Sequence, residues 1–96
     1  MMWEQLDTIG TEGSEGGTII ADEEYRQSCR ITLEKCERWD AITCGVYGAM
    51  VHTAFADAAS SAAVYAAMKQ ELQDFIDRDT TSDEEIAFYR AFVLKY

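Results

Sequence analysis

The chain has few groups that carry metal or thiol chemistry. It contains one histidine, His52, and three cysteines without a CxxC pair. One imidazole cannot complete the usual cysteine–histidine zinc sets, so we expect no metal and no cofactor. Thiols in a reducing compartment are most often small apolar residues, and we therefore interpret Cys29, Cys36 and Cys44 as structural.

Basic residues are also scarce. Lys and Arg number 8 against 18 Asp and Glu, which gives a net charge of −10. Nucleic-acid phosphates and anionic lipid surfaces repel such a chain, so we expect neither nucleic acid nor membrane as a partner. No stretch approaches the ~20 apolar residues that cross a bilayer, and no basic region precedes an apolar run at the start. We therefore expect a cytoplasmic protein.

The usual catalytic and phosphate-binding motifs are missing. The chain has no GxSxG, and its glycine-rich run at 10–17 forms neither GxGxxG nor a P-loop. Glu12 and Glu15 within that run would also repel phosphate. The carboxylates at 77–85 fail the EF-hand template, because Ser82 stands where the template needs glycine. We therefore predict no catalytic residues.

Composition and patterning predict one α+β domain spanning residues 1–96. Apolar residues make up 48% of the chain, enough for a compact core. We expect an acidic arm and a flexible glycine-rich loop at 1–17, an antiparallel sheet at 18–56 and a helical hairpin at 57–96.

Alternation of apolar and polar residues predicts three to four strands. Residues 29–35 alternate strictly, which is typical of an antiparallel strand with one solvated face. Residues 18–21 are largely β-branched, and we interpret them as an edge strand. An exposed edge at that position is one reason to consider a homodimer.

A hairpin is predicted around Gly48. Glycine at the first central position suits a two-residue type II′ turn. That turn places His52 opposite Gly45, on the face away from the core, with a notch beside the imidazole. Cys44 would then point to the other face, so that Cys44 and His52 could not form a nucleophilic pair.

Two helices are predicted on one face of this sheet, at about 57–77 and 82–95, because the apolar period there becomes helical. Asp57 is the expected N-cap of the first helix. Ser82 and Glu85 have the spacing of a capping box for the second.

The outer face of the predicted sheet is mixed polar and aromatic. Such residue types are enriched in protein contacts, although the solvated face of an antiparallel sheet can have the same mixed composition. The residues that we expect to contact a ligand or partner are Arg30, Trp39, Tyr47, Met50 and His52.

Two functions remain open. The first, which we favour, is a protein-interaction or regulatory module with a protein partner, such as a bacterial immunity-type inhibitor of a basic protein. The net charge and the missing catalytic motifs support it. The alternative is a small-ligand or enzymatic site around His52, with Arg30 binding an anion and Tyr47 donating a hydrogen bond.

Overall fold

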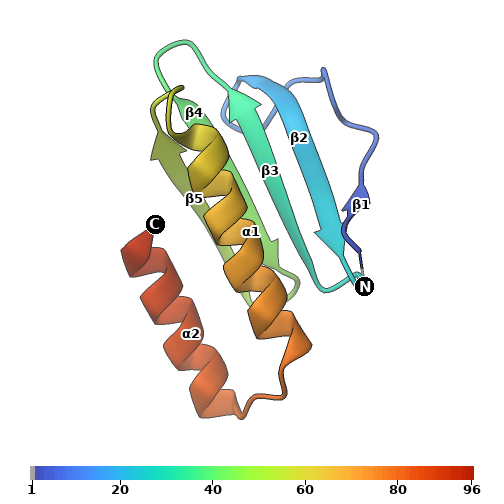
Figure 1. The fold of residues 1–96 in the computed structure, drawn as a ribbon, viewed down its shortest axis with the longest axis vertical. Helices are drawn as coiled ribbons and strands as arrows, with labels where there is room; N and C mark the ends of the chain where they lie inside the picture. The colour runs from blue at the N-terminus through green and yellow to red at the C-terminus, as the bar shows by residue number, and fades with distance from the viewer. Residues whose placement is uncertain (1) are drawn as a thin grey trace.

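A computed structural model describes residues 2–96, which form a five-stranded antiparallel sheet followed by two helices (Figure 1). The α+β class is therefore confirmed, while the predicted number of three to four strands was too low. The strands occur in sequence order across the sheet: β1 (Glu4–Gln5), β2 (Thr18–Tyr25), β3 (Cys29–Lys35), β4 (Asp40–Val46) and β5 (Met50–Ala56). The helices are α1 (Ser61–Asp77) and α2 (Ser82–Lys95).

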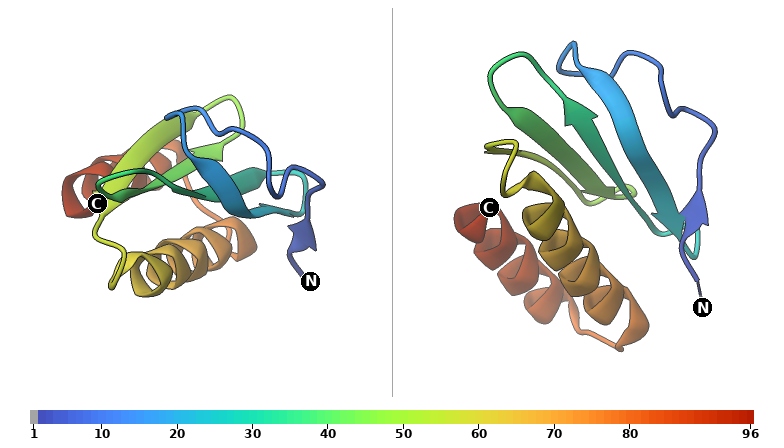
Figure 2. Two further views of the ribbon diagram at one scale, coloured as in Figure 1. Left: turned by 90° about the horizontal axis from the view of Figure 1, so that it is seen from above. Right: turned by 45° about the horizontal axis from the view of Figure 1, so that its top comes forward.

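The sheet and α1 form two separate layers. α1 packs across β3, β4 and β5, and α2 lies beside α1 (Figures 1 and 2). No helix among residues 2–96 covers the opposite face of the sheet, which we call the uncovered face. None of these helices is long and apolar enough to cross a bilayer.

The core lies between the sheet and the helices. Ile31 of β3 and Ile42 of β4 are fully buried there against Met68 and Leu72 of α1 and Phe92 of α2. Successive strand residues point to opposite faces, so the alternation in 29–35 correctly identified the core side of β3.

The turn between β4 and β5 differs from the predicted type II′ turn. Gly48 has a φ of +76° at the second central position of a turn that the Ala49 N–H closes onto the Val46 carbonyl at 3.0 Å. The connection is thus one residue longer than predicted, and Cys44 pairs with His52. A shift of one residue turns every side chain of β5 to the other face.

The N-terminal segment pairs with the edge of β2 that does not contact β3. β1 pairs with β2, and further along the Ile19 N–H donates to the Thr11 carbonyl at 2.9 Å. The predicted exposed edge at residues 18–21 is therefore wrong, because those residues lie between this segment and β3.

The glycine-rich loop is held by a buried carboxylate of β3. Glu34 is 1% exposed, and its Oε1 accepts hydrogen bonds from the backbone N–H groups of Glu15 at 3.0 Å and Gly17 at 2.9 Å. The sequence predicted a flexible loop that packs nothing, whereas the structure packs it against the end of the uncovered face.

Both helix starts are shifted from the predicted caps. Asp57 does not cap α1; its carboxylate closes a separate turn by accepting from the N–H of Ser60 at 2.9 Å. α2 does have a capping box, but one residue earlier than predicted: Thr81 Oγ1 accepts from the Glu84 N–H, and the Glu84 carboxylate accepts from the Thr81 N–H.

Candidate functional site

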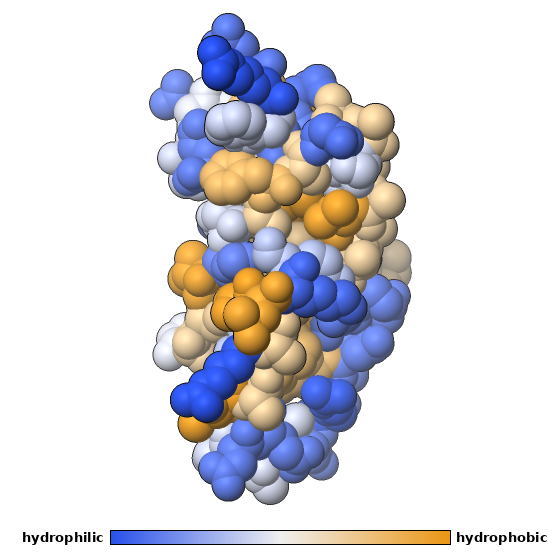
Figure 3. All heavy atoms as spheres, turned by 90° about the vertical axis from the view of Figure 1, so that its left-hand side faces the viewer, coloured by the Kyte–Doolittle hydropathy of each residue, from blue (hydrophilic) through white to orange (hydrophobic). Residues whose placement is uncertain are grey.

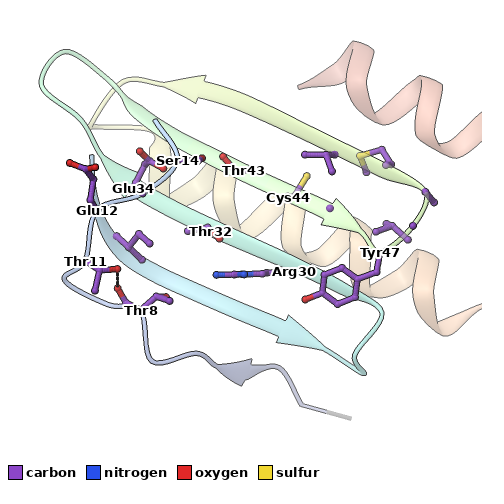
Figure 4. A pocket seen from close by; sticks show the side chains of 18 residues that line it. Thr8, Thr11, Glu12, Ser14, Arg30, Thr32, Glu34, Thr43, Cys44 and Tyr47 are labelled. Atoms are coloured by element: carbon purple, nitrogen blue, oxygen red, sulfur yellow. Dashed lines mark hydrogen bonds between the residues drawn. The ribbon is translucent and has the colours of Figure 1, made fainter. Parts of the chain in front are cut away.

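The uncovered face contains a hollow of about 740 Å³. It extends from the loop at 8–14 to the β4–β5 turn, and its floor includes Thr32, Thr43 and Gly45 (Figure 4). Ligand pockets commonly have volumes of about 300–1,000 Å³, so this hollow is large enough to receive a ligand or a short peptide segment.

Small residues in the middle of the face create the hollow. Gly45 presents no side chain, and a Cβ at that position would lie 3.2 Å from the Met50 carbonyl oxygen. The hydroxyls of Thr43 and Thr53 lie 3.1 Å apart across β4 and β5. Bulkier groups stand at the two ends, with Tyr47 at one end and the N-terminal loop at the other.

Arg30 points across the floor, but its charge is already compensated. Its Nε and Nη2 donate to the two carboxylate oxygens of Asp22 at 2.9 and 2.6 Å. Thr8 and Thr32 also donate to Asp22, whose side chain is fully buried. Burial alone would raise the pKa of Asp22, but hydrogen bonds from Arg30, Thr8 and Thr32 outweigh it, and the pKa lies below its usual value.

Tyr47 is the other polar group at this end. Its hydroxyl donates to Glu24 at 2.5 Å while the side chain stays half exposed. Burial, together with this bond, raises the pKa of Tyr47 to about 12. Tyr47 therefore remains a neutral phenol, and it presents mainly its aromatic ring to the hollow.

Carboxylates dominate the charge around the hollow. Glu12 and Glu34 line it at the loop end, and Asp22 and Glu24 are the hydrogen-bond partners of Arg30 and Tyr47. Four carboxylates and one guanidinium give a local charge of −4 + 1 = −3. The hollow consequently favours a cation over an anion.

Apolar side chains stand next to the hollow. Val51 lines it and is 79% exposed, and Phe55, which points the same way from β5, is 55% exposed. The Trp39 ring lies 5.8 Å from the Phe55 ring in an edge-on contact. Sequence reasoning missed Val51 and Phe55 because the predicted register placed both in the core.

His52 lies on the other side of the sheet, contrary to the prediction. Its ring is 6.4 Å from Phe92 of α2, edge-on. His52 Nε2 is the one buried side-chain polar atom without a hydrogen-bond partner within residues 2–96. The side chain of Met50 likewise packs against the core, although part of the residue lines the hollow. Of the five predicted contact residues, Arg30 and Tyr47 thus both present their side chains at the hollow.

Cys44 and His52 share the core face, whereas the sequence predicted opposite faces. Cys44 is 2% exposed, and burial raises its pKa to about 12, so that it remains a thiol. No hydrogen bond joins the two side chains in the described part of the chain. The pair therefore has neither the thiolate nor the solvent access of a nucleophilic site.

Exposed apolar residues also occur on α2, where Leu94 is 87% and Ile86 is 49% exposed. Figure 3 shows the side of the molecule where β5 and α2 lie, and hydrophilic residues separate the hydrophobic ones there. No group of three or more potential metal ligands occurs among the described residues.

Comparisons with protein-family models, curated proteins and solved structures find no significant match.

Proposed function

We propose that the protein is an interaction module that binds a cationic protein partner through the uncovered face of its sheet. The proposal rests on the combination of a hollow with exposed Trp39, Val51 and Phe55 on a face that no helix within residues 2–96 covers. Aromatic and apolar groups that lose water on binding supply most of the affinity at protein interfaces.

The charge of the chain supports a basic partner. The net charge is −10, and the groups around the hollow contribute −3 of it. Opposite charges accelerate association, and the effect weakens as salt screens it. An inhibitor of a basic protein, including one of the immunity type, would use such a surface.

The geometry gives less support to a ligand or catalytic site around His52. The imidazole lies between the sheet and α2, away from the hollow. Arg30, the group that was expected to bind an anion, is already paired with Asp22.

The proposal can be tested with surface variants that spare the core. Val51→Asp and Phe55→Asp each place a charge on the uncovered face, and Leu94→Asp places the same charge on the outer side of α2. The three immobilised variants and the wild type are incubated with an extract of the source organism at about 0.05 M and about 0.5 M salt.

We expect wild type and Leu94→Asp to retain a common basic protein at low salt only. Val51→Asp and Phe55→Asp should lose it, because each replaces an apolar contact with a carboxylate that loses its water in the interface. Equal retention by all four proteins, or retention that is insensitive to salt, would contradict the proposal.

A further inference from the structure

The outer edge of β5 lacks the features that usually protect the edge of a sheet. β5 is the last strand, and no strand within residues 2–96 pairs with its other side. It has seven residues in continuous register with β4, without a bulge. β1, at the opposite edge of the sheet, has only two residues. A long, regular edge is a template for pairing with another chain.

β5 also carries no charged side chain. It is the one strand of the five without Asp, Glu, Lys or Arg, and the charge-free run extends over residues 41–56. Charged residues make up 27% of the whole chain, so such a run is not typical of it. Because each copy of the chain has a net charge of −10, an uncharged edge is where two copies meet at the lowest electrostatic cost.

The hydrogen bonds at the two ends of β4 show in which direction its backbone groups point. The Tyr47 N–H donates to the Ser28 carbonyl at 3.0 Å, and the Cys36 N–H donates to the Trp39 carbonyl at 3.1 Å. Tyr47 and Trp39, which flank β4, thus both bond toward the side of β3. The direction alternates along a strand, so the odd-numbered residues of β4 bond to β3 and the even-numbered residues bond to β5.

Three residues of β5 therefore present unused backbone groups at the edge. Even-numbered residues of β4 pair with even-numbered residues of β5, as Cys44 does with His52. The N–H and C=O groups of Val51, Thr53 and Phe55 consequently point away from the sheet. These groups have no hydrogen-bond partner in the part of the chain that the structure describes. α2 contacts β5 through the His52 ring on the core side, and it forms no hydrogen bond with this edge.

We propose that two copies of the chain pair through β5, antiparallel about a two-fold axis at Thr53. In this register Thr53 lies opposite Thr53 of the second copy, and Val51 lies opposite Phe55 on either side of it. Every member of these pairs has outward-pointing groups, so the two residues of each pair exchange both of their backbone hydrogen bonds. The same surface serves both copies, as a two-fold interface requires.

The side chains of these pairs also match. On the uncovered face, the exposed Val51 of one copy packs against the exposed Phe55 of the other. Because paired residues point to the same face, the two uncovered faces lie on the same side of the joined sheet. The inference is independent of the proposed function, and it is compatible with it because both hollows stay on that side.

Sedimentation equilibrium of the full chain from about 0.02 mM to about 1 mM tests whether a dimer forms. One pair of strands is a small interface, so we expect a dissociation constant on the order of 0.1 mM. Raising the salt concentration from about 0.05 M to about 0.5 M should strengthen the dimer, because salt screens the repulsion between two acidic copies. A monomeric mass at about 1 mM under both salt conditions would overturn the inference.

Amide hydrogen exchange tests whether the dimer uses this edge. With a dissociation constant of about 0.1 mM, the monomer fraction falls from about 0.8 at about 0.02 mM to about 0.2 at about 1 mM. Exchange of the Val51, Thr53 and Phe55 amides should therefore slow about fourfold. The amides of His52 and Ala54 already bond to β4 and should not change. Protection of other amides instead, such as those of α2, would place the contact elsewhere and contradict the proposal.

Thr53→Lys places like charges opposite each other at the axis and should weaken the dimer about fivefold, although it reduces the overall repulsion between the copies. Leu94→Lys makes the same charge change on the outer side of α2 and should not weaken the dimer. Thr53→Val also loses the 3.1 Å contact with the Thr43 hydroxyl but adds no charge, and it should dimerise like the wild type. Equal dissociation constants for the two lysine variants would rule out the proposed register.

Salt separates this inference from the proposed function, because self-association grows with salt whereas retention of a basic partner declines. If the chain stays monomeric but Val51→Asp loses the basic protein, the dimer is wrong and the proposed function stands. If the dimer forms while every surface variant retains the same proteins, the reverse holds. Protection of the edge amides only after a basic protein is added would make that partner the occupant of the edge and overturn the inference.

Discussion

Asp22 joins the N-terminal segment to β2 and β3, and its replacement by asparagine is the most informative perturbation of the uncovered face. The carboxylate is fully buried and accepts from Thr8, Thr32 and two nitrogens of Arg30. Asp22→Asn keeps the shape, but it removes the charge and turns one acceptor into a donor that faces the guanidinium.

The magnitude follows from the bonds that are lost. Hydrogen bonds to charged groups contribute ~1.5–3 kcal/mol each to stability. The Arg30 side chain is 41% exposed, so solvent screens its pair with Asp22, and the bonds do not add in full. We expect Asp22→Asn to lower the free energy of unfolding by about 2–3 kcal/mol at pH 7.

The loss should depend on pH in a defined direction. The pKa of Asp22 in the folded protein lies below its usual value, which is close to that in the unfolded chain, about 3.9. The stabilisation is therefore complete above about pH 4 and disappears as pH falls through the folded-state pKa. Wild type and Asp22→Asn should consequently converge in stability as the pH falls below about 4.

Urea unfolding followed by circular dichroism measures both effects. With a slope of about 1–1.5 kcal/mol/M for a chain of this size, the midpoint should fall by about 2 M at pH 7. Asp79→Asn, at an exposed position, should shift it by less than about 0.5 M. A difference that stays constant from pH 7 to about pH 2.5 would refute the reasoning.

Three further predictions concern the helices and the thiols. Thr81→Ala should lower the free energy of unfolding by about 1 kcal/mol and Ser82→Ala by clearly less in thermal denaturation, because the Thr81 hydroxyl is the cap. Phe92→Ala should destabilise by about 3–5 kcal/mol and Leu94→Ala by less than about 0.5 kcal/mol; equal losses would contradict the packing of α2. At about pH 8, mass spectrometry should find iodoacetamide only on Cys36 in the native protein, because Cys36 is partly exposed whereas Cys29 and Cys44 are buried. Burial raises the pKa of Cys36 too, but Cys29 and Cys44 combine a pKa of about 11 and about 12 with a lack of access to the reagent.

The side of the sheet that faces the core could be predicted for β3, because burial of one face makes apolar residues recur at every second position. In β3 the residues that face the helices are apolar and their neighbours are polar, so that one register buries far more apolar surface than the other. β5 lacks this contrast, because Val51 and Phe55 on its outer face are as apolar as Met50 and Ala54 on its inner face. The hydrophobic pattern thus could not choose between two registers for β5.

Turn chemistry did not resolve that ambiguity. A glycine with positive φ fits either central position of a four-residue turn, depending on the turn type, and Gly48 occupies the second. The wrong register placed His52 on the uncovered face and placed Val51 and Phe55 in the core. The exposure of these two apolar side chains on the outer face was therefore not predicted.

The loop end of the hollow depends on contacts that are distant in sequence. Asp22 and Glu34 look like solvated strand residues, yet both are buried by the N-terminal segment that they hold. Neither the glycine-rich composition of that segment nor the alternation in β3 indicates that the two segments contact each other. The residues that form these hydrogen bonds come together only in the folded chain.

The central claim is that the uncovered face of the sheet contacts the partner, and site-specific photocrosslinking tests it most directly. A photoreactive side chain replaces Val51 on that face or Leu94 on the outer side of α2, both of which are largely exposed. We predict that the group at position 51 forms an adduct with a basic protein and that the group at position 94 does not. An adduct from position 94 alone, or equal adducts from both positions, would contradict the claim.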